Sequence, residues 1–303
     1  MTSLVLSTAL LVWGQAPTPT PVVDPSNIER KLTVDGRERK YHFHLPRGYD
    51  PKKATPVVVV LHGAMMNGKM MEFFCGMSAQ ADRSGFIVCY PDGTGTGPLL
   101  TWNAGSFPVG AANAKRPDDI AFLGKMLDDL GTAANIDAKR VYVAGMSNGG
   151  MMAYRVAAEM SDRIAAIASV TGTLTIDEWK PKRPVSVLQI HGTKDGIVPF
   201  TGTKDNPLLK FPAIETVVAR CAKANGCDEK PKVTELPQIR DDLKVEKRDY
   251  GKSKSGAEVV LYVIEGGGHT WPSRLAPSFL GKTTFNLDGN EVIWEFFSRH
   301  RRE

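Results

Sequence analysis

The chain has 303 residues, of which 42% are hydrophobic and 23% are charged, and this composition excludes a disordered or fibrous protein. Its net charge of +5 comes from 38 basic and 33 acidic residues that are scattered along the chain, with one tight basic run at 299–302. Nucleic-acid binding needs a clustered basic stripe, so that class of protein is disfavoured. Four cysteines are too few for a disulfide scaffold, and no apolar run is long enough to span a membrane.

The first 26 residues predict a leader and a linker. Residues 4–13 are apolar but only about half as long as a transmembrane helix, and small residues follow them. This pattern predicts a signal peptide over residues 1–16, with a disordered tail as the alternative because no Lys or Arg precedes the apolar run. The Pro-rich residues 17–26 predict a stiff, extended linker. We therefore expect one folded domain over residues 27–303 of a secreted or periplasmic protein.

Strand and helix patterns alternate through this domain. A hairpin is expected around Asp35 and Gly36, and a long Gly-rich loop over residues 92–116. Strands are expected at 28–33, 38–45, 57–61, 86–90, 141–144, 164–170, 185–190 and 259–264. Helices are expected at 70–83, from Asp118 or Asp119 to Leu130, from Gly149 to about Met160, at 213–225 and at 288–299. This order predicts an α/β fold with a mostly parallel sheet, helices on both faces, and site residues at the carboxyl ends of the strands.

Residues 145–149 have the sequence GMSNG, which matches the G-x-S-x-G pattern of a nucleophile elbow. A strand pattern precedes them and a helix pattern follows, and the glycines permit the sharp turn that lifts the Ser147 hydroxyl into the crevice. The backbone N–H of Asn148, at the start of the helix, is expected to face a developing oxyanion. The alternative for Ser147 is an ordinary helix N-cap.

A serine alone is a poor nucleophile, so it needs a base, and the base needs an acid to orient it. Asp195 follows the strand at 185–190, and His269 lies in a glycine-rich loop after the strand at 259–264. Both are in the chain order that this kind of site requires. The alternative for His269 is an exposed loop histidine, and His191 is expected to brace the loop that carries Asp195.

The segment after the strand at 57–61 supports two different interpretations. In the first, the backbone N–H of Ala64 is the second oxyanion donor and His62 is a bracing group. In the second, residues 63–69 (GAMMNGK) form a phosphate loop, although Met70 stands where a Ser or Thr would ligate Mg²⁺. The competing hypothesis is therefore a P-loop nucleotide-binding protein that binds ATP with Mg²⁺ and does not react with a fluorophosphonate.

The cysteines predict one local cross-link. Cys221 and Cys227 lie six residues apart around an Asn-Gly turn, which suits a small disulfide in an exported protein. No histidine lies near them at the spacing of a zinc site, so no metal is expected. Cys89 lies in a buried strand pattern and is expected to be inert, whereas the state of Cys75 is left open.

Four motifs together make the chain resemble a known family: YPDGTG at 90–95, GMSNGG at 145–150, HGTKDGIVPF at 191–200 and GGGHTWP at 266–272. Over roughly residues 27–300 the chain is similar to the secreted α/β-hydrolase esterases related to feruloyl esterases and polyhydroxybutyrate depolymerases. The resemblance implies an α/β-hydrolase catalytic domain with Ser147, Asp195 and His269 as a catalytic triad and no cofactor.

The resemblance also implies a substrate. It places Trp102 and Trp271 at the substrate cleft, with packing of the loops as the alternative role for both side chains. Ser106-Phe107 stands where relatives often carry a cysteine pair, so the loop at 92–116 is expected to be more mobile. The implied function is a secreted serine carboxylesterase that hydrolyses hydroxycinnamate (feruloyl-type) esters of plant-wall saccharides. Polyhydroxyalkanoate or other polyester oligomers are the alternative substrates, and transfer of the acyl group to a sugar is mechanistically open. The expected partner is a small-molecule or oligosaccharide ester, with no nucleic acid and no membrane span.

Overall fold

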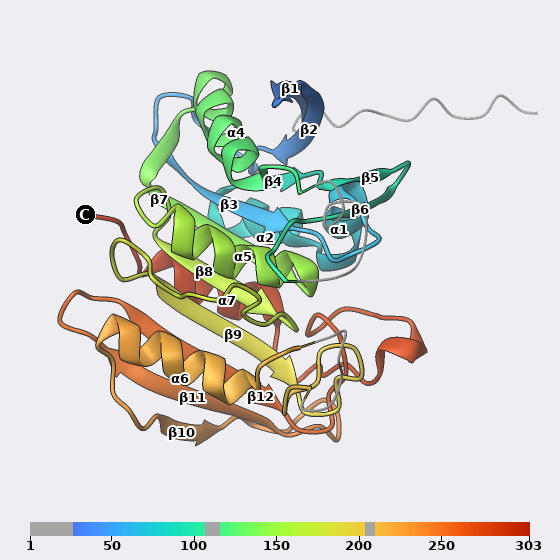
Figure 1. The fold of residues 1–303 in the computed structure, drawn as a ribbon, viewed down its shortest axis with the longest axis vertical. Helices are drawn as coiled ribbons and strands as arrows, with labels where there is room; N and C mark the ends of the chain where they lie inside the picture. Colours follow the sequence, from blue (N-terminus) through green and yellow to red (C-terminus); the bar gives the residue numbers. More distant parts are fainter. Residues whose placement is uncertain (1–26, 107–115, 204–209) are drawn as a thin grey trace, which may run out of the picture.

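A single ten-stranded sheet organises the part of the chain that this computed structural model describes, residues 27–106, 116–203 and 210–303 (Figure 1). The strand order is β1-β2-β4-β3-β7-β8-β9-β12-β11-β10. The central strands are mutually parallel: β4 (Ile87–Pro91), β3 (Thr55–Leu61), β7 (Ile136–Met146), β8 (Ala166–Val170), β9 (Ser186–Gly192) and β12 (Glu258–Ile264). The antiparallel hairpins at the two edges are β1 (Asn27–Val34) with β2 (Arg37–His44), and β10 (Lys232–Glu235) with β11 (Val245–Lys252).

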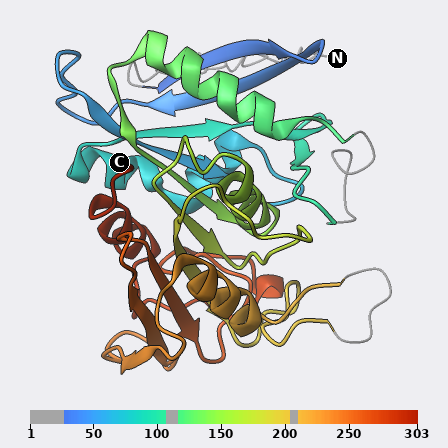
Figure 2. The same cartoon turned by 60° about the vertical axis from the view of Figure 1, so that its left-hand side comes forward.

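Helices cover both faces of this sheet. On the side toward the viewer in Figure 1 lie α4 (Asp119–Ala133), α5 (Asn148–Glu159) and α6 (Ile214–Asn225), and Figure 2 shows the same elements after a turn of 60°. The other face carries α1 (Gly68–Cys75), α2 (Met77–Ser84) and α7 (Gly289–Ser298). Strand β3 shows why its valine run is continuous: Val57 and Val59 pack into the first core, whereas Val58 and Val60 pack into the second. Because both faces of a parallel strand are covered, every position must be apolar.

Most of the expected elements are present near their expected bounds. The hairpin turn falls at Asp35 and Gly36, both with positive φ, and Asp118 caps α4 by accepting a hydrogen bond from Ala121 N at 2.9 Å. The expected helix at 70–83 is instead two helices, because Gly76 adopts a left-handed conformation with φ of 61° and ends the first of them. The expected Gly-rich loop begins with a short hairpin, β5 (Thr94–Thr96) and β6 (Leu99–Thr101).

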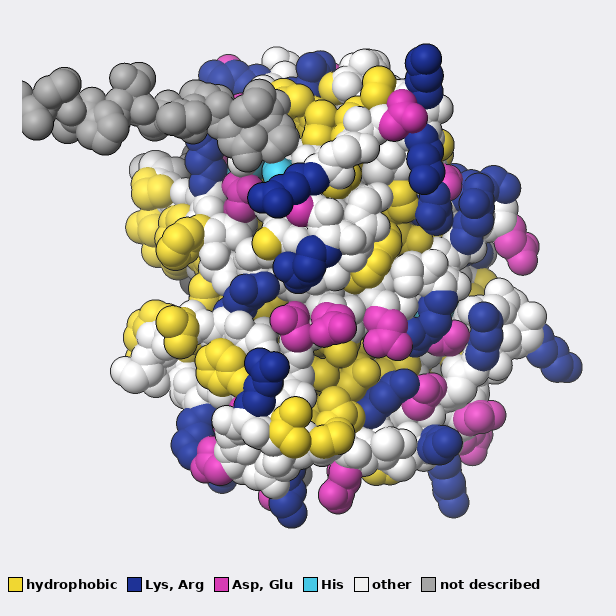
Figure 3. Space-filling view, turned by 180° about the vertical axis from the view of Figure 1, so that it is seen from behind, with side chains coloured by type: hydrophobic (Ala, Val, Ile, Leu, Met, Phe, Trp, Pro, Cys, Tyr) yellow, Lys and Arg dark blue, Asp and Glu magenta, His cyan; other side chains and the backbone are white. Residues whose placement is uncertain are grey.

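Some expectations fall outside the described residues. These are the signal peptide over residues 1–16, the linker over residues 17–26, and residues 107–115 of the loop at 92–116 that was expected to be more mobile. Within the residues that the structure does describe, no helix is both long enough and apolar enough to cross a membrane. Figure 3 shows one face of the molecule, where basic and acidic side chains are interspersed.

The expected disulfide is absent, because Cys221 and Cys227 are both free thiols. Cys221 lies in the last turns of α6 and is buried in the core against the sheet. Cys227 follows the left-handed Gly226 that ends this helix, and its thiol donates to the carbonyl oxygen of Ala257 at 3.5 Å. The helix end therefore directs the two thiols to different surroundings. The other two cysteines, Cys75 and Cys89, are also free and fully buried.

Candidate active site

The turn between β7 and α5 holds Ser147 in an unusual conformation. Its φ of 55° and ψ of −122° lie where a residue other than glycine is seldom found, which is typical of a strained functional turn. A Cβ atom added at Gly145 would lie 2.3 Å from the Gly149 oxygen, and one added at Gly149 would lie 2.2 Å from the Leu61 oxygen. Both positions therefore require glycine. Ser147 makes no side-chain capping bond to α5, which argues against the N-cap alternative.

His269 and Asp195 form a buried pair beyond the carboxyl ends of the parallel strands. Nδ1 of His269 lies 2.8 Å from Oδ2 of Asp195, and the two residues are 4% and 5% exposed. Burial by itself raises the pKa of Asp195, but hydrogen bonds from His191 and His269 outweigh it and hold this pKa well below its usual range. The carboxylate is therefore ionised at neutral pH. Because it accepts the Nδ1 proton, it leaves Nε2 of His269 as the nitrogen with a free lone pair.

Backbone hydrogen bonds join the segments that carry the three residues. Ser147 N donates to Val170 O at 2.9 Å, which ties the turn after β7 to the end of β8. Lys194 N donates to Gly267 O at 2.9 Å, which ties the turn after β9 to the loop after β12. All of these segments leave the carboxyl ends of parallel strands. The predicted nucleophile, base and acid therefore lie at the same end of the sheet, where ligands bind in such folds.

The backbone amides predicted to bind the oxyanion, those of Ala64 and Asn148, lie in segments that border Ser147. A Cβ added at Gly63 would lie 3.6 Å from the Ser147 Cβ, so the turn after β3 lies directly against the serine. Met65 N in that turn donates to Leu100 O, but no acceptor for the Ala64 or Asn148 N–H groups is found among the described residues. The Asn148 amide is also the first of α5, where the helix dipole favours negative charge.

His62 braces the turn in a neutral form. Its Nδ1 lies 2.7 Å from the Gly63 carbonyl oxygen and must donate, whereas its Nε2 accepts from Gly93 N at 2.9 Å. Burial lowers the pKa of His62 to about 4, so the ring is uncharged at neutral pH. The ring packs against Trp102 with centroids 4.9 Å apart, which confirms the expected bracing role.

Both tryptophans that the resemblance placed at the cleft are buried. Trp102 is 1% exposed, and its indole N–H donates to His62 O at 3.0 Å. Trp271 is fully buried, and its indole N–H donates to the side chain of Asn290 at 2.9 Å. Little indole surface is left for a substrate ring, so the structure favours the packing alternative for both residues.

The motif between β3 and α1 that resembles a phosphate loop is already occupied by protein groups. Gly68 N donates to the Asp92 carboxylate at 2.7 Å, so an internal carboxylate lies where a phosphate would bind. Lys69 lies 3.6 Å from Glu29 and is largely exposed. These contacts disfavour the nucleotide-binding hypothesis.

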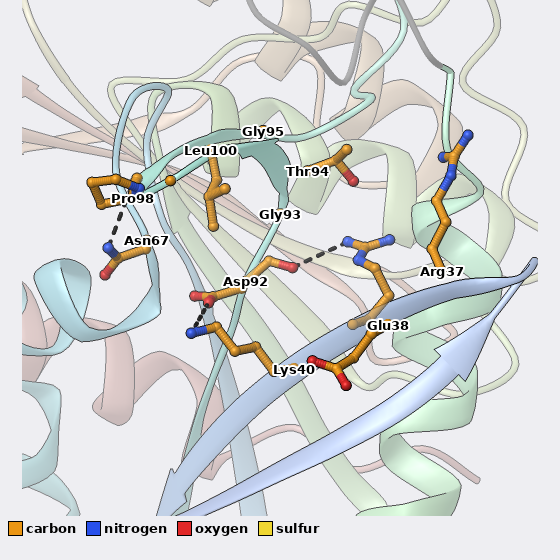
Figure 4. A pocket seen from close by; sticks show the side chains of 12 residues that line it. Arg37, Glu38, Lys40, Asn67, Asp92, Gly93, Thr94, Gly95, Pro98 and Leu100 are labelled. Atoms are coloured by element: carbon orange, nitrogen blue, oxygen red, sulfur yellow. Dashed lines mark hydrogen bonds and ion pairs between the residues drawn. The ribbon is translucent and has the colours of Figure 1, made fainter.

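A cavity of about 420 Å³ opens between β2 and the β5–β6 hairpin (Figure 4). Two of its charged side chains pair with Asp92: Lys40 lies 3.4 Å from the Asp92 carboxylate, and Arg39 donates to the Asp92 carbonyl oxygen at 3.1 Å. Ser147, Asp195 and His269 are not among the residues that line it. We therefore assign this cavity no part in the candidate site.

The sequence did not predict two of the contacts that organise the site. The Asn148 side chain accepts from Trp102 N at 2.7 Å and donates to Trp102 O at 3.2 Å. His191 lies 3.3 Å from the carboxylate oxygen that also binds His269. The only signal in the sequence was the presence of Asn148 and His191 inside the motifs around Ser147 and Asp195.

Comparison with known proteins identifies the class. Residues 49–211 match the model of the phospholipase/carboxylesterase family, so the chain belongs to this family, and its fold is that of the α/β-hydrolases. It is 34% identical to "Putative esterase NocK" of Nocardia uniformis subsp. tsuyamanensis, over 91% of this chain and 84% of that protein. It is 30% identical to feruloyl esterase B of Piromyces equi, over 76% of this chain but only 42% of that protein.

More distant matches agree on the fold. The chain is 25% identical to feruloyl esterase D of Neurospora crassa, over 88% of this chain and 83% of that protein. The structure of an acetyl xylan esterase from Aspergillus awamori superposes with a TM-score of 0.61 at 16% identity, over 90% of this chain and 99% of that one. The expected fold class and the resemblance to this group of esterases are therefore confirmed.

Proposed function

We propose that this protein is a serine carboxylesterase whose triad is Ser147, His269 and Asp195. The observation that carries the proposal is the buried pair of His269 and Asp195, whose Nδ1 and Oδ2 atoms lie 2.8 Å apart. This pair lies at the same end of the sheet as the strained turn at Ser147. Asp195 fixes the His269 tautomer with its proton on Nδ1, so Nε2 is the nitrogen that accepts a proton.

The chemistry follows from these roles. Ser147 Oγ attacks the ester carbonyl carbon while its proton passes to His269 Nε2, and the carbonyl oxygen becomes an oxyanion. The Ala64 and Asn148 N–H groups donate to this oxyanion. The intermediate collapses, the alkoxy group takes the proton from His269, and an acyl-serine forms. Water then repeats the sequence, with His269 as base, to release the acid and restore Ser147.

The proposed substrates are hydroxycinnamate esters of plant-wall saccharides, and the proposed location is outside the cytoplasm. The relatives named feruloyl esterases support this substrate class at 30% and 25% identity. Short polyester oligomers are the second candidate because apolar side chains are exposed in the turn after β3 and on β6. Met65, in that turn, is 47% exposed, and Leu99, on β6, is 46% exposed. Such side chains suit an aliphatic ester as well as an aromatic one.

The test is a hydrolysis panel on the purified chain. It compares methyl ferulate, p-nitrophenyl esters of rising acyl length and hydroxybutyrate oligomers, with fluorophosphonate labelling of wild type and Ser147→Ala in parallel. We expect wild type to be labelled and to favour methyl ferulate. Faster cleavage of hydroxybutyrate trimers would favour the second candidate. ATP binding with Mg²⁺ and no labelling would support the nucleotide-binding hypothesis instead.

A further inference from the structure

Two histidines share the Asp195 carboxylate. His269 Nδ1 lies 2.8 Å and His191 Nε2 lies 3.3 Å from the same oxygen, Oδ2. The other oxygen, Oδ1, accepts the backbone N–H groups of Ile197 and Val198, each at 2.9 Å. His191 is fully buried at the end of β9, four residues before Asp195. One side chain in contact with this carboxylate therefore lies outside the proposed triad.

The surroundings of His191 fix which ring nitrogen carries its proton. Nε2 lies 2.8 Å from the carbonyl oxygen of Val198, which can only accept, so Nε2 carries hydrogen. The amide nitrogen of Gln189 lies 3.0 Å from the Gly172 carbonyl oxygen, and this acceptor fixes the amide orientation. The same nitrogen lies 3.0 Å from His191 Nδ1 and donates to it. His191 thus has hydrogen on Nε2, which is bonded to Val198 O, and Asp195 Oδ2 lies 3.3 Å from the same nitrogen.

The contacts continue to the helix that follows the serine. Tyr154 on α5 donates its hydroxyl to Gln189 Oε1 at 2.8 Å, and both side chains are fully buried. Burial raises the pKa of Tyr154 well above its usual value, so this hydroxyl stays protonated. A continuous path of contacts thus runs from α5 to Asp195: hydrogen bonds join Tyr154, Gln189 and His191, and a 3.3 Å contact joins His191 to Asp195. In the described structure, the ionisable side chains in contact with Asp195 are His191 and His269.

We infer that His191 is a positioning residue for the ester hydrolysis proposed above, and the inference rests on that function. Its N–H holds Oδ2 of Asp195 in line with His269. A neutral donor also stabilises the negative charge of the carboxylate, so Asp195 attracts a protonated His269 less strongly than it would without His191. His191 therefore weakens the attraction between Asp195 and a protonated His269, and it does so without touching the substrate.

The test compares His191→Leu with His191→Gln in the whole chain. Leucine removes the donor, whereas the glutamine amide nitrogen lies as far along the side chain as Nε2 and keeps it. We expect His191→Leu to lower kcat about 10- to 100-fold with KM little changed, because the acid no longer holds the base in line. We expect the acid limb of the kcat/KM profile to move up by about half a pH unit to one unit. His191→Gln should return both values toward wild type.

His42→Leu is the matched control, because His42 is also buried and pairs with a carboxylate, Glu72, at 2.9 Å. It lies on β2, away from the proposed triad, so its acid limb should match that of wild type. The inference fails if His191→Leu keeps the wild-type profile, or if His191→Gln loses as much as His191→Leu. If Ser147 is still essential when such results are found, only the role of His191 is overturned. If the chain stays active without Ser147, the proposed function is overturned.

A measurement on the wild-type protein covers the case in which the leucine variant does not fold. Nitrogen-15 NMR of histidine-labelled protein reports the protonation of each ring nitrogen. We expect His191 to carry hydrogen on Nε2 and none on Nδ1 at neutral pH, because Nε2 faces the Val198 carbonyl oxygen and Nδ1 faces the Gln189 amide. A His191 cation at neutral pH, or hydrogen on Nδ1, would contradict the inference.

Discussion

The side chain of Asn148 holds the backbone of Trp102 by two hydrogen bonds, accepting from its N–H at 2.7 Å and donating to its carbonyl oxygen at 3.2 Å. The residue after the proposed nucleophile thus anchors the loop that follows the β5–β6 hairpin. Trp102 in turn packs on His62, which braces the turn that carries Ala64. The two backbone amides proposed to bind the oxyanion are therefore linked through one buried tryptophan.

Trp102→Ala should accordingly lower the activity on every substrate and not on one alone. Removing a buried tryptophan should lower the free energy of unfolding by about 3–5 kcal/mol. The kcat/KM values for methyl ferulate and for a short acetyl ester should fall by the same factor. Trp294→Ala, which removes a stacking partner of Phe86 on the opposite face, is the control for loss of stability alone. A loss on methyl ferulate that exceeds the loss on the acetyl ester by about 1–3 kcal/mol would show that Trp102 contacts the acyl ring.

Ser147→Ala should abolish ester hydrolysis and fluorophosphonate labelling while leaving the fold intact, because the change removes one oxygen that makes no capping bond. The residual rate should come from the oxyanion donors and binding alone, about 10³–10⁴-fold over water. Steady-state kinetics and circular dichroism measure the two outcomes. Retention of even a few per cent of activity would mean that another side chain is the nucleophile.

Asp195→Asn should reduce kcat by about 10⁴-fold, because an amide can present an N–H to His269 Nδ1 and so favour the wrong tautomer. The matched control is Asp177→Asn, since Asp177 is an exposed carboxylate beyond the end of β8. We expect its kcat to equal that of wild type. The assignment of the acid would move elsewhere if Asp195→Asn kept its activity and a different acidic residue proved essential.

His62 should make the protein less stable in acid. Burial lowers its pKa from 6.5 to about 4, so the unfolded chain binds a proton at a pH where the folded protein does not. The contribution of the buried, neutral His62 to the free energy of unfolding is complete above pH 6.5 and is lost as pH falls toward 4. The full shift in the pKa of His62 corresponds to about 3 kcal/mol of this free energy. Urea unfolding of wild type and His62→Gln at a series of pH values measures it. If the stability difference between them does not change with pH, the buried neutral state of His62 is wrong.

The outer strands show where sequence patterns stop being informative. Residues 57–61 predicted a buried strand because a strand covered on both faces must be apolar throughout. β11 has the sequence VEKRDYGK and all of β10 is exposed, so neither shows the apolar pattern of a core strand. The antiparallel pairing of β11 with β12 places it in the sheet. Similarly, the helix pattern across residues 70–83 did not reveal the break at Gly76, which depends on its left-handed conformation.

For the candidate site, the sequence by itself determined the residue types and their order. The glycines around Ser147, and the positions of Asp195 and His269 after apolar strand patterns, follow from local steric and hydrophobic requirements. Only the tertiary structure decided which groups meet. It brought His191 to the Asp195 carboxylate, Asn148 to the Trp102 backbone, and both tryptophans into the interior, and it directed the Cys221 and Cys227 thiols to different surroundings. Such contacts depend on the directions of side chains across neighbouring strands and loops, which periodicity along one chain does not contain.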